Sequence, residues 1–373
     1  MKLKLRTLFI FAGCLLGHFA FANVDLHMHL TIEVPLSPFF QGHLNQTAVA
    51  TDATSRLKSR IDAQTLKNSG LDLIVAVIYI NPVWGDPQKQ VTEQIQLLNI
   101  FCQNNPIWKI ATEPDQARDF LKSGHHVFIL SLEGGWIFQD QKIFEDLIFK
   151  HGIRIVTPLH FSDLYNVIGQ PAQQKGLFGP IQKIINFFQR KSENSLTPLG
   201  QQLISFLFKN KIWIDLSHAS DRVQADVIAQ MPAGYPILFT HTVLQKYYGS
   251  DRGLDQNMLI KIKQSAGAIG LLPSDEMLLN TPVDLNDCQK SNPFLTQWNE
   301  IKNLIGDENL FLGSDLNSPI PMLSAKTTDK KCKPFMINGL VTAADLFEVS
   351  ELKTSKTGSD SKAILNLWSR VRK

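Results

Sequence analysis

The chain has little charge of either sign and no excess of one sign beyond its first residues. Only 19% of its 373 residues are charged, and the formal net charge is +3. Lys2, Lys4 and Arg6 account for this excess because no acidic residue stands among residues 1–22, so residues 23–373 are formally neutral. A neutral chain has no basic surface for nucleic acid, which we therefore exclude as a partner. The 44% apolar content excludes a disordered chain.

The chain also lacks an apolar run that spans a membrane comfortably, which takes roughly 20 residues. Residues 8–21 are apolar but shorter, follow three basic residues, and lead into the small-x-small pattern of Ala20-Phe21-Ala22. This order is typical of a secretory signal peptide. We therefore expect residues 1–22 to be cleaved and residues 23–373 to be periplasmic or secreted, without a transmembrane span. An uncleaved anchor is the alternative.

Cysteine is scarce, with four in the whole chain. Removal of the expected signal peptide leaves Cys102, Cys288 and Cys332. An odd number in an oxidising compartment leaves one thiol over, which is compatible with a Cys288–Cys332 disulfide and a buried Cys102. Three reduced cysteines are the alternative. The chain has no internal repeat and no low-complexity segment.

Short β-branched and apolar runs alternate with helical patterns, which is typical of repeated βα units. We therefore predict an α/β fold, a (β/α)8 TIM-type barrel in one domain with a C-terminal extension. The expected strands span residues 24–29, 71–80, 126–133, 153–160, 212–218, 237–241, 268–272 and 310–315. The expected helices span residues 53–69, 88–104, 141–151, 198–209, 220–229, 257–265, 293–305 and 362–371.

Three further segments exceed a minimal barrel. Residues 161–196 and 274–291 follow the fourth and seventh predicted strands, where insertions form lids and substrate walls. The segment from Lys326 onward is rich in lysine and is expected to be a solvated loop. Two helix starts are well marked, at Thr197-Pro198 and at Ser220.

Six polar side chains stand where predicted strands end, and each can bind a metal ion. They are His27, His29, Glu133, His218, His241 and Asp315. The carboxyl ends of parallel strands meet at one rim of a barrel, so these side chains should converge. Residues i and i+2 of a strand share a face, so His27 and His29 can both point to the barrel axis. Two imidazoles suit zinc or a similar borderline cation.

Glu133 follows an apolar run and precedes Gly134-Gly135. A buried carboxylate is costly unless a cation neutralises it, and its two oxygens can bridge two metal ions. A salt-bridged glutamate at the rim is the alternative. His218 and His241 end successive strands and should complete a second metal site, although histidines bonded to the backbone are common. Asp315 should lie near the first strand, where it can move a proton between a metal-activated water and a leaving amine.

The chain resembles the membrane dipeptidase family, also called the renal dipeptidase family, of the amidohydrolase superfamily. The resemblance extends along nearly all of residues 23–373. It is carried by D-L-H at 25–27, L-E-G-G at 132–135, L-T-P-L-G at 196–200, I-D-L-S-H at 214–218, T-H at 240–241, R-G-L-D at 252–255 and G-S-D at 313–315. It implies a metal-dependent hydrolase barrel over residues 23–373 that cleaves dipeptides with two zinc ions.

The resemblance also implies a role for individual residues. It makes Glu133 the bridge between the zinc ions, with His218 and His241 completing one site and His27 belonging to the other. It makes Asp315 the proton shuttle.

Two residues are implied to contact the substrate. His160 would approach its carbonyl group, and Arg252 would pair with its terminal carboxylate. A planar guanidinium can hold a carboxylate with two hydrogen bonds, which agrees with this role for Arg252. A surface arginine in a loop is the alternative.

The sequence departs from the family pattern at three places. His29 stands where the family usually has aspartate, which removes one negative charge and should weaken metal affinity or change the preferred metal. The seventh strand ends in Leu272-Pro273-Ser274, where a tyrosine would help to hold the substrate carboxylate. Leu316-Asn317-Ser318 follows Asp315, in place of the usual Asp and Gly.

The main prediction is thus a periplasmic or secreted zinc dipeptidase, acting on a dipeptide or small amide and compatible with a homodimer. Two alternatives remain open. One is an amidohydrolase for a different amide, a lactone or a specialised metabolite. The other is a dipeptidase-like binding protein whose altered ligands no longer hold two metal ions.

Overall fold

The computed structural model describes residues 23–47, 50–163, 166–176, 179–180, 182–184, 195–284, 286–324, 340–346 and 359–373. The expected signal peptide, the expected solvated loop from Lys326 and Cys332 lie outside the described residues. None of the helices in the described ranges is long and apolar enough to cross a membrane.

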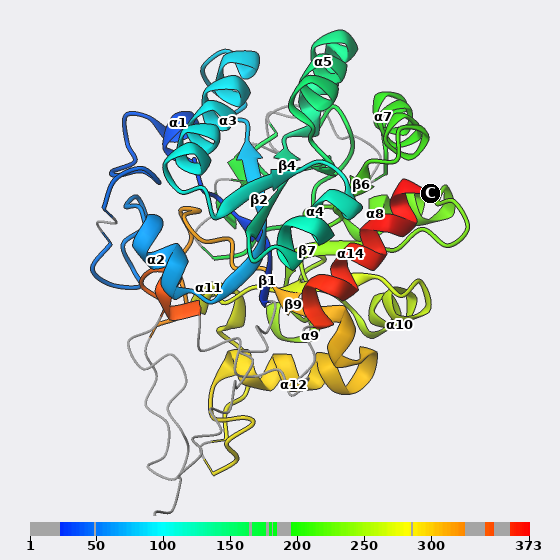
Figure 1. Cartoon of the computed structure of the whole chain (residues 1–373). Coiled ribbons are helices and arrows are strands. Elements are labelled where there is room, and N and C mark those ends of the chain that lie inside the picture. Colours follow the sequence, from blue (N-terminus) through cyan, green and yellow to red (C-terminus); the bar gives the residue numbers. More distant parts are fainter. Residues whose placement is uncertain are drawn as a thin grey trace, which may run out of the picture.

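Parallel strands form a nearly closed barrel at the centre of the described structure (Figure 1). An isolated bridge between Asp215 and Leu238 joins the two ends of the strand path. The predicted TIM-type α/β barrel is confirmed. Around the barrel the strands follow the order β6 (Trp213–Ile214), β5 (Ile155–Thr157), β4 (His126–Glu133), β2 (Leu71–Tyr79), β1 (Asn23–Met28), β9 (Leu310–Leu312), β8 (Ala268–Leu271) and β7 (Leu238–Thr242).

One βα unit was missed in the sequence. β3 (Trp108–Ala111) pairs only with the first half of β4, and α4 (Pro114–Lys122) follows it. β3 is too short to show alternation, and α4 begins without a side-chain cap, although its apolar residues lie on one face. The eight predicted strands are therefore the strands of the barrel, and β3 is an additional strand outside the barrel path.

Helices cover the outside of the barrel, and most of the longer ones begin at a side-chain cap. Thr197 and Ser220 accept the backbone hydrogen bonds of helix starts, as predicted. The predicted helix over 53–69 is wrong in extent, because Asp62 and Thr65 form a capping box that begins α2 only at Ala63. The longer helices are α2 (Ala63–Asn68), α3 (Pro87–Asn104), α5 (Gln141–His151), α7 (Pro198–Lys209), α8 (Asp221–Ala229), α10 (Gln256–Gln264), α12 (Pro293–Ile305) and α14 (Ser359–Arg372).

Short helices lie in the connections between the strands and longer helices. They are α1 (Glu33–Leu36), η1 (Gly135–Gln139), α9 (Gln245–Tyr248), α11 (Asp275–Leu278), η2 (Asp307–Asn309) and η3 (Ala343–Leu346). Residues 161–196 and 274–291 follow β5 and β8, the fourth and seventh strands of the barrel, which are the predicted insertion points.

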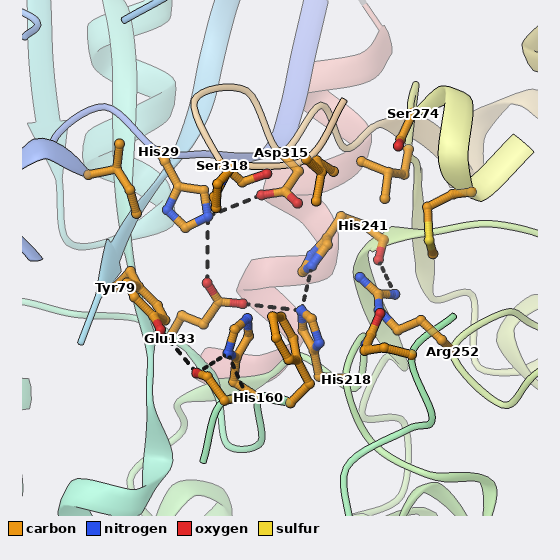
Figure 2. A pocket seen from close by; sticks show the side chains of 18 of the residues that line it. His29, Tyr79, Glu133, His160, His218, His241, Arg252, Ser274, Asp315 and Ser318 are labelled. Carbon is orange, nitrogen blue, oxygen red and sulfur yellow. Dashed lines mark hydrogen bonds and ion pairs between the residues drawn. The ribbon is translucent and has the colours of Figure 1, made fainter. Parts of the chain in front are cut away.

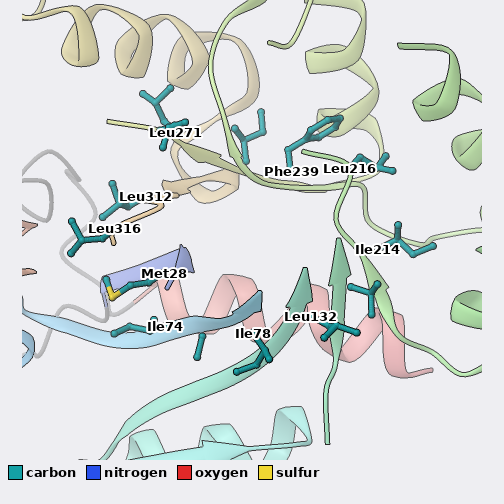
Figure 3. Packing of buried hydrophobic residues seen from close by; sticks show 14 of the residues in the cluster. Met28, Ile74, Ile78, Leu132, Ile214, Leu216, Phe239, Leu271, Leu312 and Leu316 are labelled. Carbon is teal, nitrogen blue, oxygen red and sulfur yellow. The ribbon is translucent and has the colours of Figure 1, made fainter. Parts of the chain in front are cut away.

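Alternate residues of each strand belong to two different cores. In β4, Phe128 and Leu132 pack outward with the helix layer, whereas Val127 and Ile129 belong to the interior of the barrel. Figure 3 shows the outward layer around Met28, Ile74, Ile78 and Leu132. Glu133 continues the inward row of β4, so its side chain points into the barrel mouth.

The C-terminal helix α14 closes the opposite end of the barrel. Its Ile364 and Trp368 pack against interior residues of several strands, including Leu26, Val75 and Ile129. The predicted C-terminal extension thus supplies part of the barrel core.

Cysteine pairing was left open by the sequence, and the structure decides part of it. Cys288 is disulfide-bonded, and Cys102 is free and half-buried. Three reduced cysteines are therefore excluded. The partner that we expected, Cys332, lies outside the described residues.

Candidate functional site

The predicted metal ligands converge at the barrel mouth. Figure 2 shows four of them, His29, Glu133, His218 and His241. His29 Nε2 lies 3.6 Å and His27 Nε2 lies 3.8 Å from Oε2 of Glu133. On the other side, His218 Nε2 lies 3.4 Å from Oε1 of Glu133 and 2.9 Å from Nε2 of His241. The two oxygens of Glu133 therefore face two different pairs of histidines.

Two ligand groups share Glu133. His27, His29 and Glu133 form one, and Glu133, His218 and His241 form the other, each with ligand atoms within 4.8 Å of one another. His27 Nε2 and Glu133 Oε1 are buried without a hydrogen-bond partner among the described residues. Orphaned polar atoms of this kind are costly, and a cation would satisfy them. The nitrogen and oxygen donors fit a pair of zinc-like cations.

A hydroxyl group beneath the cluster orients two of the histidines. Thr240 Oγ1 donates its proton to Oδ2 of Asp215 at 2.6 Å. It also lies 2.9 Å from Nδ1 of both His27 and His241. Because its one proton is committed to Asp215, Thr240 accepts from both imidazoles, which leaves their Nε2 lone pairs for a metal ion.

Asp215 is itself held by several donors. Its carboxylate accepts hydrogen bonds from the hydroxyl groups of Thr157 and Ser217 and from the backbone N–H of Thr240. A buried carboxylate with this many donors remains in place as the base of the network. Asp215 also forms a third candidate ligand group with His27 and His241.

The titration of the cluster matches a cation site. Burial lowers the pKa values of His218 and His241 well below the ordinary value, so both imidazoles are neutral and can donate lone pairs. Burial alone would raise the pKa of Glu133, but His160, His27 and His29 hold it well below its usual range. Burial opposes the charged form of His27, yet the carboxylates of Glu133 and Asp315 raise its pKa overall.

Irregular strand pairing places the ligands at their positions. The register between β1 and β2 shifts between Asp25 and Met28, and that between β7 and β8 shifts between Phe239 and Thr242. His27 and His241 lie within these two shifts. Irregularities of this kind bend a strand and re-aim its side chains, so they contribute to the convergence on Glu133.

Asp315 lies beside the first ligand group in a strained backbone conformation. Its φ of 51° is in the left-handed region, and its N–H donates to the carbonyl of His27 at 2.8 Å. Its Oδ1 lies 3.1 Å from Nε2 of His29. Backbone strain of this kind is common at functional sites, and here it turns the carboxylate toward the ligands.

His160 is held by a chain of two hydroxyl groups. The backbone N–H of Ser162 donates to Nδ1 of His160 at 3.3 Å, and Ser162 Oγ lies 2.6 Å from the same nitrogen. The hydroxyl of Tyr79 lies 3.0 Å from Ser162 Oγ. An amide can only donate, so Nδ1 of His160 is the acceptor and Nε2 carries the proton. Burial lowers the pKa of His160 to about 4, which keeps the ring neutral near pH 7.

Arg252 lines the same cavity and is only 3% exposed. Its Nη1 donates to the carbonyl of His241 at 2.8 Å, and its Nε is buried without a hydrogen-bond partner among the described residues. The alternative of a surface arginine is therefore wrong. A buried cation with a free donor is suited to an anionic ligand.

Arg252 and every predicted ligand except His27 line one cavity of about 250 Å³. Its described lining also includes Ile32, Leu36, Tyr79, Val83, Trp84, Phe161, Lys175, Tyr248, Leu272, Ser274, Glu276, Met277 and Ile320.

The family of the chain follows from its match to a family model. Residues 20–352 match the model of the membrane dipeptidase family, peptidase family M19. The chain belongs to the membrane dipeptidase family. It is therefore an enzyme that hydrolyses peptide bonds, and membership implies a metal cofactor.

Solved structures share the barrel at low sequence identity. A metallopeptidase from Rhodobacter sphaeroides, solved with a phosphinate mimic of the dipeptide L-Ala-D-Ala, is 16% identical, with a TM-score of 0.66 over 94% of this chain and 99% of that one. The probable dipeptidase PvdM from Pseudomonas aeruginosa is 14% identical, with a TM-score of 0.66 over 94% of this chain and 96% of that one. At this identity the likeness shows the fold alone.

Two of the predicted departures from the family pattern lie in the site. The imidazole of His29 takes part in the first ligand group. Ser274 lines the cavity where tyrosine was expected, and its hydroxyl donates to the carbonyl of Pro321.

The structure brings all the predicted site residues into one cluster, although their chemical roles stay predictions. Four supporting residues were missed, namely Tyr79, Ser162, Asp215 and Thr240. Tyr79 ends an apolar strand, and Asp215 and Thr240 stand just before His218 and His241. Those polar residues in apolar segments were the available signal.

Proposed function

We propose that this family member is a dipeptidase that works with two zinc ions at the Glu133 cluster. The observation that carries the proposal is the division of the Glu133 oxygens between two histidine groups, in a cavity that also holds Arg252. When bound, the two cations polarise the substrate carbonyl group and lower the pKa of a water molecule to about 7.

Residues of the chain bind and orient the substrate. Arg252 holds the terminal carboxylate through its free guanidinium donors. The Nε2–H of His160 donates a hydrogen bond to the oxygen of the scissile carbonyl, where negative charge develops. Both contacts place the amide over Glu133 in the same orientation.

Asp315 moves the proton. Its carboxylate takes a proton from the attacking water and gives it to the nitrogen of the leaving amine. The strained backbone at Asp315 supports this role because it turns the carboxylate toward His29 and the ligand cluster.

The test combines metal analysis with a panel of dipeptides, including some with a D-residue at the C-terminal position. We expect two zinc ions per chain and cleavage of at least some dipeptides. Glu133→Gln should lose bound metal and lower kcat by about 10³-fold or more, because the bridging carboxylate is gone.

The matched control is Glu93→Gln, the same change at a surface glutamate whose side chain is 47% exposed. It should leave metal content and kcat unchanged. A protein that retains its fold but binds no metal, or that cleaves no dipeptide with zinc, manganese or cobalt, would contradict the proposal.

A further inference from the structure

The cavity has two walls of opposite character. One wall, from α1 and the loop after β2, carries Ile32, Leu36, Val83 and Trp84. The other wall, from the segments after β5 and β7, carries Lys175, Tyr248 and Arg252. We call them the apolar wall and the basic wall.

The two walls face each other across the metal ligands. β2 and β7 are four places apart along the strand path, and that path closes through Asp215 and Leu238. Strands four places apart in an eight-stranded barrel lie on opposite sides. Figure 2 likewise shows His29 and Tyr79 on one side of Glu133 and Arg252 on the other.

This arrangement gives the substrate a direction, provided that the proposed function holds. The carboxylate of the amino-acid product lies at the basic wall with Arg252. The scissile carbonyl lies over Glu133, beside His160. The group attached to the carbonyl carbon must then point to the apolar wall.

The apolar wall has no carboxylate for a substrate ammonium group. Among the described residues that line the cavity, the acidic ones are Glu133, Asp315 and Glu276. Glu133 faces the histidines, and Asp315 Oδ1 lies 3.1 Å from His29 Nε2. Glu276 packs against Gly176 near the basic wall.

His29 and Glu33 add nothing anionic to this wall. His29 presents an imidazole, which carries no negative charge. Glu33 follows Ile32 in the chain but does not line the cavity. An ammonium group at the α-carbon of a dipeptide would therefore leave water for a wall that offers it no anionic partner, which is unfavourable.

The apolar wall also extends past the cavity. Trp84 is 44% exposed and Val83 is 58% exposed. The ring of Phe39, itself 62% exposed, lies 6.1 Å from that of Trp84 in an edge-to-face contact. A substrate group longer than the cavity would continue over these side chains and cover apolar surface.

We propose that this site prefers N-acyl amino acids whose acyl group is apolar and carries no amino group. Hydrolysis breaks the amide C–N bond. Water supplies hydroxyl to the acyl carbon and a proton to the nitrogen, so the products are a carboxylic acid and a free amino acid. The chemistry is that of the proposed dipeptidase, and only the group on the acyl side differs.

The test uses a matched pair of substrates, hexanoyl-alanine and norleucyl-alanine, each with L- and D-alanine. The two differ only in that norleucine carries an amino group where the hexanoyl chain has hydrogen. We expect kcat/KM at pH 7 to be about tenfold or more higher for hexanoyl-alanine. Calorimetry with phosphinate analogues, with and without the amino group, should show the same order of Kd.

The outcomes separate this inference from the proposed function. Equal kcat/KM values, or a preference for norleucyl-alanine, would overturn the inference and leave the dipeptidase in place. Failure to cleave either compound or any dipeptide would overturn both.

A variant tests whether the apolar wall makes the contact. Trp84→Ala should lower kcat/KM for hexanoyl-alanine about tenfold and change that for acetyl-alanine about twofold or less, because the short acyl group does not reach Trp84. The control is Phe149→Ala, which removes an aromatic ring that is 53% exposed on α5 and does not line the cavity. Equal losses for the two substrates would contradict the assignment of the wall.

Discussion

Single groups that contact Nδ1 decide the protonation pattern of the histidines at this site. The hydroxyl of Thr240 leaves Nε2 of His27 and His241 free for metal ions, whereas the backbone N–H of Ser162 leaves Nε2 of His160 protonated. The histidines thus differ in which ring nitrogen carries the proton, and the atom that contacts Nδ1 sets this difference. The sequence pattern identifies the histidines as site residues, but it does not identify the groups that contact their Nδ1 atoms.

The first prediction concerns Ser162 and Tyr79 as positioning residues for His160. Ser162→Ala should lower kcat about tenfold with little change in KM, because the imidazole loses the hydroxyl that orients it toward the carbonyl. Tyr79→Phe should have a smaller effect of the same kind, since only the outer hydroxyl is removed. Steady-state kinetics check both, and ¹⁵N NMR reports the tautomer of His160.

Ser162→Thr is the matched rescue, because it keeps the hydroxyl. A purely structural role for Ser162 would give equal losses in the alanine and threonine variants. Such a result would contradict the prediction.

The second prediction concerns Glu33, whose two side-chain oxygens are buried without a hydrogen-bond partner among the described residues. Burial raises its pKa from 4.5 to about 7. Below pH 4.5 the folded and unfolded states both hold the proton, so the group has no effect. Above it the unfolded state ionises first, so stability falls with rising pH until the folded state also ionises near pH 7.

Glu33→Gln removes this effect because the amide stays neutral. The variant should match the wild type near pH 4.5 and exceed its free energy of unfolding by about 3 kcal/mol at pH 8. Urea denaturation at several pH values measures the difference. Glu93→Gln, at an exposed site, should show no such pH dependence, and a destabilised Glu33→Gln at pH 8 would refute the prediction.

At the scale of elements, capping and length decide which helices and strands could be predicted from the sequence. α5, α7 and α12 have the predicted bounds, and each begins at a side-chain cap. β3 was missed because it is only four residues long, and α4, which follows it, begins without a side-chain cap. Local signals thus predict an element most readily when it is long enough and its start is capped.

The third prediction concerns α14, which closes the barrel floor. Trp368 is 1% exposed and packs beside interior residues of the strands. Trp368→Ala should lower the free energy of unfolding by about 3–5 kcal/mol, because it opens a large cavity in the core. Lys362→Ala, at an exposed position of the same helix, should change it by about 0.5 kcal/mol or less. A similar loss in both variants, measured in urea, would contradict this role.

At the scale of the whole molecule, the proposed export of the chain and the pairing of its cysteines are related, because disulfides form in oxidising compartments. The basic start and apolar stretch of residues 1–22 support our proposal that the chain is exported. The disulfide at Cys288 agrees with an oxidising compartment.

The fourth prediction is that the exported protein begins at Asn23 and carries one free thiol, on Cys102. N-terminal sequencing and alkylation of the unfolded, unreduced protein check both points. Peptide mass spectrometry should join Cys288 to Cys332. An N-terminus at Met1, or three alkylated cysteines, would show that the prediction is wrong.

The residues alone were sufficient for the barrel and for the predicted metal ligands, because both depend on local patterns. An apolar strand that ends in histidine or glutamate can be recognised within a few residues, and parallel strands bring such ends to one rim. His29 could be singled out in the same way.

The division of Glu133 between two ligand groups, the tautomers of the histidines and the opposite walls of the cavity needed the tertiary structure. Each depends on side chains from strands far apart in the sequence, such as Thr240 between His27 and His241, or Trp84 across from Arg252. Their meeting depends on how the barrel closes and where its strands shift register, and no local pattern of residues encodes that geometry.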